Sequence, residues 1–294
     1  MASLTVSTQQ TREPPDPPAA GRTEPELDDR LLEAFKGDMT PKFMATRDRD
    51  GTPNVVPIIS VQPFDRRTLI FGNFFMCKTE RNLKEDPRVS VAVFTKGLYG
   101  ATVRGRFDGF RTTGEHVDIV NASPTLRYNA YMGVRSAGAI RIAGAPEPFQ
   151  WSRLAVVSGH LASKIHRGPA RRLSAGRKML HPLVAQKFAR IAAVKAISFL
   201  DPQGYPCAVP VMALEPAAPD VLLFPKQPMA EALRELREGV RTAASVITLE
   251  PVAFQIKGTF REVNANWGAI VVDRVYHASP PYVGKEIRPF GGCR

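Results

Sequence analysis

Two segments of this chain match each other at a constant spacing. Residues 51–57 read GTPNVVP, and residues 204–210, which lie 153 positions later, read GYPCAVP. A period this long that occurs twice indicates a duplicated domain rather than a solenoid, whose units are shorter and more numerous. We therefore expect an internal pseudo-dimer. This repeat spacing relates further identical pairs: Leu69 and Leu222, Phe71 and Phe224, Met76 and Met229, Arg81 and Arg234, Leu83 and Leu236, Val93 and Val246, Gly105 and Gly258, and Phe107 and Phe260.

Length and composition fit two globular domains. The chain has 294 residues, of which 44% are hydrophobic, enough for two cores. Its three cysteines are far apart and form no C-x-x-C pair, so neither a disulfide framework nor a zinc site is indicated. The sequence shows no apolar run long enough to cross a bilayer and no secretory signal pattern. We therefore expect a cytoplasmic protein without a membrane span.

The positive charge is concentrated between the two repeats. The formal net charge is +12, and no acidic residue lies between Glu147 and Asp201. Such a segment fits a solvated linker, or contacts with a phosphate-rich ligand, nucleic acid or an anionic membrane surface. No nucleic-acid-binding motif accompanies it, which disfavours nucleic acid as a partner. Its cations are Arg153, Lys164, Arg167, Arg171, Arg172, Arg177, Lys178, Lys187, Arg190 and Lys195.

Many short strands separated by turns predict a small antiparallel barrel in each repeat. In the first repeat the pattern predicts strands at 42–47, 55–62, 68–71, 89–95 and 101–110, and helices at 26–36 and 78–85. A further helix is predicted at 115–120 and a strand at 139–143, whereas the prolines and glycines after residue 275 argue against regular structure there. The predicted organisation is a disordered tail (1–25), a first barrel (26–150), a basic connecting segment (151–193) and a second barrel (194–294).

The order of motifs in the first repeat resembles a known family. Asp50-Gly51-x-Pro53-x-Val55-Val56-Pro57 is followed by Lys78-Thr79-x-x-Asn82-Leu83 and then by Asp86-Pro87-Arg88-Val89. This arrangement is similar to the pyridoxamine-5′-phosphate-oxidase-like split barrels that bind FMN. The resemblance implies a mainly β fold with α additions. Family members are usually homodimers with flavins at the interface, so it also implies two tandem split barrels that form a pseudo-dimer within one chain.

A phosphate site is expected at the start of the helix at 78–85. A helix N-terminus offers free N–H groups and the positive end of the helix dipole, and Lys78 and Thr79 add a cation and a hydroxyl. Asn82 lies one turn further on. By resemblance these three residues hold the FMN phosphate, with Arg47 as a second cation. The alternative is a capped surface helix with solvated cations.

The second repeat differs at this place. The positions equivalent to Lys78, Thr79 and Asn82 are Glu231, Ala232 and Glu235. Two carboxylates repel a phosphate. We therefore expect at most one FMN per chain, with its phosphate on the first repeat and its ring covered by the second.

The resemblance places Thr46, Pro57, Ile58, Gly72 and Asn73 around the isoalloxazine ring. Their alternative role is ordinary barrel core and turn. No side chain stands out as a general acid or base, which is compatible with flavin chemistry, where the cofactor carries the reaction. The implied function is an FMN-dependent oxidoreductase that acts on a small organic substrate, anionic substrates included, with a nicotinamide as a candidate electron donor.

Three alternatives stay open at this level. The cofactor can be the deazaflavin F420, whose phosphate-bearing tail also suits a basic groove. It can be haem bound through His277, although the five histidines lack metal-ligand spacing and no metal site is predicted. The protein can also be a non-catalytic flavin- or anion-binding module. Whether the pseudo-dimer stays monomeric or forms a higher homo-oligomer is not encoded in any of these motifs.

Overall fold

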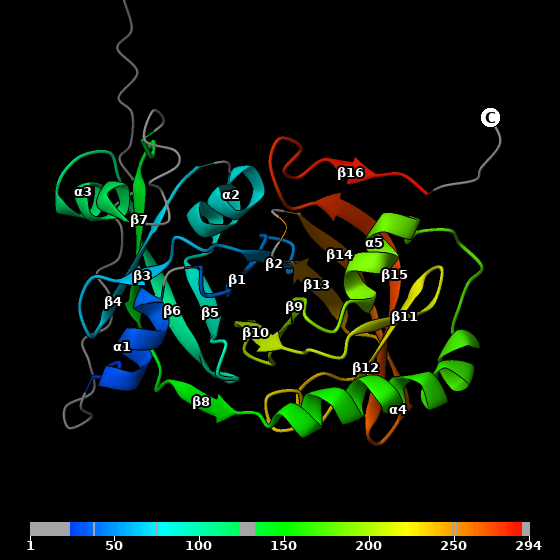
Figure 1. Ribbon diagram of the computed structural model, residues 1–294. Helices are drawn as coiled ribbons and strands as arrows, with labels where there is room; N and C mark the ends of the chain where they lie inside the picture. The colour runs from blue at the N-terminus through cyan, green and yellow to red at the C-terminus, as the bar shows by residue number, and fades with distance from the viewer. Residues whose placement is uncertain are drawn as a thin grey trace, which may run out of the picture.

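The chain folds into two antiparallel sheets that lie side by side. The structure is a computed structural model, and it describes residues 24–37, 39–74, 76–123, 133–248, 250 and 252–289. The predicted disordered tail therefore falls almost entirely outside the described residues. Figure 1 shows the first sheet, in blue to green, beside the second, in yellow to red. The fold is mainly β, with two split barrels in tandem, as expected from the sequence.

Each sheet has eight strands in the same spatial order. The first runs β2-β1-β5-β6-β7-β4-β3, with β8 paired to β6, and the second runs β10-β9-β13-β14-β15-β12-β11, with β16 paired to β15. The first sheet consists of β1 (Lys42–Arg47), β2 (Pro53–Pro57), β3 (Gln62–Pro63), β4 (Thr68–Gly72), β5 (Arg88–Phe94), β6 (Tyr99–Arg111), β7 (Ala137–Ile142) and β8 (Glu147–Gln150). The second consists of β9 (Val194–Leu200), β10 (Pro206–Pro210), β11 (Glu215–Ala218), β12 (Val221–Pro225), β13 (Arg241–Ile247), β14 (Ala253–Asn264), β15 (Trp267–His277) and β16 (Glu286–Ile287).

The repeat spacing found in the sequence also relates the strands. The bounds of β2, β4 and β5 map onto those of β10, β12 and β13 without a shift at either end. The turns between the first two strands match as well. Gly51 and Gly204 adopt φ of 78° and 73°, a left-handed conformation that glycine enters without a steric penalty. In both turns the glycine N–H donates to the carbonyl of an aspartate, Asp48 at 3.0 Å and Asp201 at 2.8 Å.

The described residues include five helices: α1 (Asp29–Lys36), α2 (Cys77–Glu85), α3 (Glu115–Ala122), α4 (Arg153–Arg171) and α5 (Pro182–Ala189). The predicted helix at 26–36 begins later, at Asp29, because Asp28 caps it by accepting a hydrogen bond from the Leu31 N–H at 2.8 Å. The predicted strand at 55–62 divides, since residues 58–61 form a turn between β2 and β3.

Successive side chains along the central strands alternate between the core of a barrel and the interface between the two sheets. In β5, Val91 points into the core of the first barrel, whereas Ala92 packs in a cluster with Ala196, Ala208 and Ala243 of the second sheet. Successive side chains of a strand point to opposite faces, so a strand buried on both faces has no polar side. Small residues on the outer face let the two sheets approach closely, which places the two barrels against each other as the sequence predicts.

The segment predicted as a connector packs against the second sheet. Trp151, Val184 and Phe188 belong to the core that fills the second barrel. Helix α4 contacts β11 and β12, and Figure 1 shows it along the outside of the second barrel.

The sequence also predicted no regular structure after residue 275. In the structure the chain instead returns as β16, with Val275 opposite Ile287.

Candidate functional site

A cleft of about 530 Å³ lies between the two sheets. That volume falls in the range of about 300–1,000 Å³ typical of small-molecule sites. One wall comes from the first repeat (β2, the following turn, the end of β4 and the start of α2) and the other from the second (β13, β14, the end of β15 and the loop before β16). Lining residues include Asn54, Pro57, Ile58, Gly72, Phe74, Met76, Lys78, Thr79 and Arg81 on the first wall, and Ile247, Gln255, Tyr276, His277, Ser279 and Val283 on the second.

The first turn of α2 faces the cleft. Met76, at the N-cap position, makes no side-chain capping hydrogen bond, so the first N–H groups of the helix have no acceptor from that residue. Lys78 and Thr79 line the cleft at this point, and the Lys78 Nζ lies 5.9 Å from the centroid of the Tyr276 ring on the opposite wall. A helix start with a cation and a hydroxyl is suited to an anion.

A second cation lies behind the opposite wall. Lys257 follows Gln255 by two positions on β14 and so projects to the same face. Its side chain is 1% exposed, and its Nζ has no hydrogen-bond partner among the described residues. Burial, together with the neighbouring Lys78, lowers the pKa of Lys257 to about 6. An unpartnered buried amine beside another cation is costly unless an anion joins them.

A buried network of amides supports the floor of the cleft. The Asn54 Nδ2 donates to the hydroxyls of Thr46 and Thr79, each at 3.3 Å, and the Asn82 Nδ2 donates to the Thr46 Oγ1 at 3.0 Å. The Gln255 Nε2 of the second repeat donates to the Asn54 Oδ1 at 3.1 Å. The network fixes the position of Thr79 and connects the two walls.

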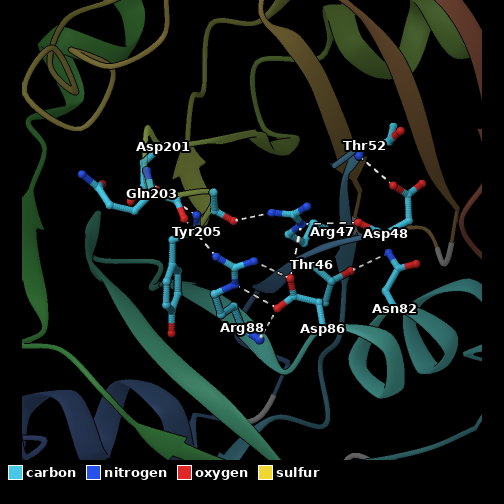
Figure 2. A network of polar contacts seen from close by, with 11 residues as sticks. Thr46, Arg47, Asp48, Thr52, Asn82, Asp86, Arg88, Asp201, Gln203 and Tyr205 are labelled. Atoms are coloured by element: carbon cyan, nitrogen blue, oxygen red, sulfur yellow. Dashed lines mark hydrogen bonds and ion pairs between the residues drawn. The ribbon is translucent and has the colours of Figure 1, made fainter. Parts of the chain in front are cut away.

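Some of the predicted site residues line the cleft, some lie beneath it, and two lie elsewhere. Pro57, Ile58, Gly72, Lys78 and Thr79 line the cleft. Thr46 and Asn82 lie beneath it in the amide network (Figure 2). The Asn73 Nδ2 donates to Glu80 at 3.0 Å and lies outside the cleft lining.

Arg47 is placed elsewhere. Its guanidinium lies 3.3 Å from Asp86 and donates to the carbonyl of Gly204 at 3.2 Å. Figure 2 shows it in a separate contact between the repeats, where Arg88 also binds Asp86 and the carbonyl of Gln203. The predicted second cation of the phosphate site is therefore absent from the cleft lining.

Sequence reasoning missed the residues that the second repeat contributes. Gln255, Lys257 and Tyr276 carry no motif of their own, and the expectation that the second repeat covers the ring named none of them. The repeat spacing contained a signal. It pairs Lys257 with Arg104, and Arg104 has its own carboxylate partner, Asp201, at 2.8 Å. The equivalent carboxylate, Asp48, accepts the Thr52 N–H just as Asp201 accepts the Tyr205 N–H, but it makes no ion pair with Lys257.

In the second barrel, the positions equivalent to the predicted isoalloxazine site border a filled space. Pro210, Val211 and Pro225 correspond to Pro57, Ile58 and Gly72, and they border a cavity of only about 20 Å³. Trp151 and the first turns of α4, including Val156, form its other side. The connecting segment thus occupies the space that is open in the first barrel.

The equivalent phosphate position has also changed. Residues 230–235 form turns, so no helix begins there, and Glu231 and Glu235 replace Lys78 and Asn82. These carboxylates line a separate cleft of about 590 Å³ together with Arg104, Asp201 and Arg234. Arg234 lies 2.5 Å from Glu231, so its charge is already matched. Among its described lining residues, this second cleft therefore offers a phosphate no free cation.

Comparison with known families agrees with the geometry. Residues 29–162 match the family model of pyridoxamine 5′-phosphate oxidase. This part of the chain belongs to the pyridoxamine 5′-phosphate oxidase-like split-barrel family. The match spans the first sheet, α2 and the start of α4, and thus includes the first wall of the cleft. A comparison with curated proteins found no match.

Several solved structures are similar to about two fifths of this chain. HupZ from Group A Streptococcus is 20% identical over 40% of this chain and 90% of its own, with a TM-score of 0.34. An FMN-binding protein from Syntrophomonas wolfei subsp. wolfei is 19% identical over 42% of this chain and 87% of its own, with a TM-score of 0.38. An F420 reductase is 22% identical over 41% of this chain and 94% of its own, with a TM-score of 0.29.

Two further features of the described residues bear on the site. No helix in the described ranges combines the length and apolarity needed to cross a membrane. Across the same ranges, no group of three or more His, Cys, Asp or Glu side chains could hold a metal ion. His277 lines the cleft between the rings of Phe254 and Tyr282, whose centroids lie 5.7 and 5.6 Å from its own.

Proposed function

We propose that the protein binds one FMN per chain in the cleft between its two barrels and acts as a flavin-dependent oxidoreductase on a small organic substrate. One observation carries the proposal. The uncapped start of α2, with Lys78 and Thr79, lines a cleft of about 530 Å³, and Lys257, which is buried and has no hydrogen-bond partner among the described residues, lies beside Lys78 behind the cleft lining. The family of the first barrel supports the choice of a flavin.

The residues fit the phosphate of FMN. The Lys78 ammonium group and the N–H groups of a helix start lie at the cleft, Arg81 also lines it, and the buried Lys257 lies beside Lys78. A phosphate dianion at this end gives Lys257 the partner that it lacks within the described part of the chain. Charge-assisted hydrogen bonds of this kind are roughly twice as strong as neutral ones.

The residues also fit a planar ring system. Pro57, Ile58 and Phe74 form an apolar side of the cleft, and Ile247 and Tyr276 face them from the second repeat. Gly72 borders the slot, and a Cβ at this position would meet Phe74 Cε2 at 2.6 Å and Val134 Cγ1 at 2.7 Å. A side chain at this position would therefore displace Phe74, which lines the slot.

The bound flavin would supply the redox chemistry, accepting or giving up a hydride or an electron pair. The chain's own residues would orient the cofactor and exclude water from one side of it. A nicotinamide is the proposed electron donor. Substrate access would be from the open side of the cleft near His277 and the loop at residues 278–284.

Experiments distinguish the proposed function from three alternatives. F420 and haem would each take the place of FMN, and a purely binding protein would hold FMN without turnover. His277 gives haem a candidate ligand in the cleft. Titration of the purified protein with FMN, F420 and haem distinguishes the cofactors, and reduction of bound FMN by NADH or NADPH distinguishes an oxidoreductase from a carrier.

Substitution of Lys78 tests the site directly. Lys78→Glu introduces the residue that the second repeat has at the equivalent position, and we expect FMN affinity to fall by at least about 100-fold, because a cation is replaced by an anion beside a phosphate. Lys84→Glu, on the same helix but paired with Glu80 on the outer surface, is the matched control. Unchanged FMN affinity in Lys78→Glu would show that the phosphate does not bind at α2.

A further inference from the structure

Helix α4 presents an apolar crest to solvent. Leu154, Leu161 and Ile165 are 81%, 58% and 79% exposed, and Val157, between them, is 44% exposed. Their spacings of three, four and four residues place all four side chains along one side of the helix. Large apolar side chains scattered singly over a surface need no explanation, but an aligned set on one helix marks an interaction site.

The opposite side of α4 is held to the second barrel by polar contacts. Glu215 on β11 accepts hydrogen bonds from the Ser163 Oγ at 2.6 Å and from Arg167 at 3.0 Å, and it also contacts the His160 imidazole. All three donors lie on the buried side of the helix. The Arg171 Nε donates to the carbonyl of Ala217 at 3.0 Å. These contacts fix the rotation of α4, so the crest is held outward.

The crest is flanked by positive charge. Arg153 and Lys164 lie on one side of it and Arg172 continues it, and each is exposed. Among the described residues none of the three forms an ion pair. No acidic residue occurs between Glu147 and Asp201, so the segment carries no carboxylate that could neutralise them.

These features distinguish between possible occupants. A second copy docked crest to crest would bring two sets of unpaired cations together, because α4 has no acidic residue to face them. Nucleic acid would use the cations but would leave the apolar crest exposed to water. An amphipathic helix with leucine and isoleucine on one face and Lys or Arg beside it fits the interface of an anionic membrane, where both parts are satisfied.

We propose that α4 is a membrane-docking helix, which lies in the plane of an anionic lipid surface with its crest inserted among the headgroups. The cations beside the crest would attract the surface, and the apolar side chains would retain the protein there. The docking would be peripheral and reversible, since only one short helix takes part. This inference is independent of the cofactor, because α4 lies outside the cleft.

Co-sedimentation with vesicles tests the proposal. We expect the full-length protein to bind vesicles of phosphatidylglycerol and phosphatidylcholine, and to bind pure phosphatidylcholine vesicles at least about tenfold more weakly. The triple substitution Leu154→Ser, Leu161→Ser and Ile165→Ser should lower the partition coefficient by about tenfold or more, since it removes the inserted side chains. Leu183→Ser, at a leucine on α5 that is 45% exposed, is the control and should bind as the original protein does.

A second pair of substitutions separates charge from apolar contact. Arg153→Gln with Lys164→Gln should weaken binding to anionic vesicles by about fivefold per cation and should make the remaining binding less sensitive to salt. All substituted side chains are exposed, so the melting temperature of each variant should match that of the original protein. The proposal is overturned if the original protein does not bind anionic vesicles or if the triple variant binds them equally well. It is also overturned if the protein forms a dimer that the triple variant converts to a monomer.

Discussion

The amine of Lys257 on β14 is buried beside Lys78, a residue of the other repeat, and has no hydrogen-bond partner within the described part of the chain. The two cations are far apart in the sequence and meet only because the two barrels pack face to face. Neither repeat alone would contain this pair. The site that we propose is therefore a property of the pseudo-dimer.

The first prediction concerns protons taken up on cofactor binding. Burial and Lys78 hold the pKa of Lys257 at about 6, so this amine is largely neutral near neutral pH in the cofactor-free protein. A phosphate beside it should raise the pKa again, so FMN binding should be accompanied by uptake of about one proton. Above about pH 7, the affinity should then fall by up to tenfold per pH unit.

Calorimetry in buffers of different ionisation enthalpy measures the proton uptake. Riboflavin, which lacks the phosphate, serves as the control ligand and should bind with little or no proton uptake. Equal uptake for FMN and riboflavin would contradict the placement of the phosphate near Lys257.

The second prediction is that Lys257→Met stabilises the cofactor-free protein while weakening FMN binding. The pKa of Lys257 is lower in the folded state than its ordinary value of 10.5, so the unfolded chain binds more protons between pH 6 and 10.5. The resulting loss of stability is fully present below about pH 6 and disappears as the pH rises through the unfolded value. Removing the buried amine near neutral pH should therefore raise the free energy of unfolding by about 1–3 kcal/mol.

Denaturant unfolding with and without FMN measures both effects. The increase in the free energy of unfolding should shrink as the pH rises toward 10. This pH dependence distinguishes removal of the buried amine from improved packing. A lower free energy of unfolding for the cofactor-free variant would show that the Lys257 amine already makes a stabilising contact without an anion.

The third prediction concerns the anchor of α4. Burial opposes ionisation of Glu215, but hydrogen bonds from His160 and Ser163 and the charge of His160 outweigh it and lower its pKa to about 2. Its contribution to stability is present above the unfolded pKa of about 4.5 and is lost as the pH falls toward 2. Glu215→Gln should cost about 2–4 kcal/mol and should expose α4 to proteolysis. Glu33→Gln, at an ion pair with Lys36 in which both side chains are exposed, is the control and should change little.

Much of the first repeat could be predicted from local sequence. The strand at 42–47 has the predicted bounds, and β5 and α2 begin within one residue of their predicted starts, because alternation and the charged turn residues define them locally. The repeat spacing anticipated the second sheet. Of the nine site residues that the resemblance predicted, five line the cleft.

The remainder depends on contacts that no local pattern specifies. Gln255 and Tyr276 reach the cleft, and Lys257 lies beside Lys78, because the second sheet packs against the first, with β13 and β14 in contact with β2. Arg47 was expected at the phosphate because it ends a strand that borders the site, but Asp86 and the Gly204 carbonyl hold it elsewhere. The filling of the second ring slot by Trp151 and α4 depends on how a connecting segment folds back, which its composition does not indicate.

The fourth prediction follows from that filled slot. The triple substitution Glu231→Lys, Ala232→Thr and Glu235→Asn restores the side chains of the first repeat in the second, yet we expect no second FMN to bind. The space for the ring is occupied by Trp151 and Val156, and residues 230–235 form no helix start. FMN titration of this variant should give the same stoichiometry as the original protein. A second equivalent of bound FMN would show that charge alone, rather than the filled slot, limits the protein to one cofactor.

The stoichiometry of FMN on the purified protein tests the central claim most directly. The visible spectrum of the protein saturated with FMN, combined with mass spectrometry of the released chromophore, gives the number and identity of the cofactors per chain. We predict one FMN per chain, lost on Lys78→Glu and retained on Lys84→Glu. Two FMN per chain, no FMN at saturating concentration, or a chromophore other than a flavin would contradict the proposed site.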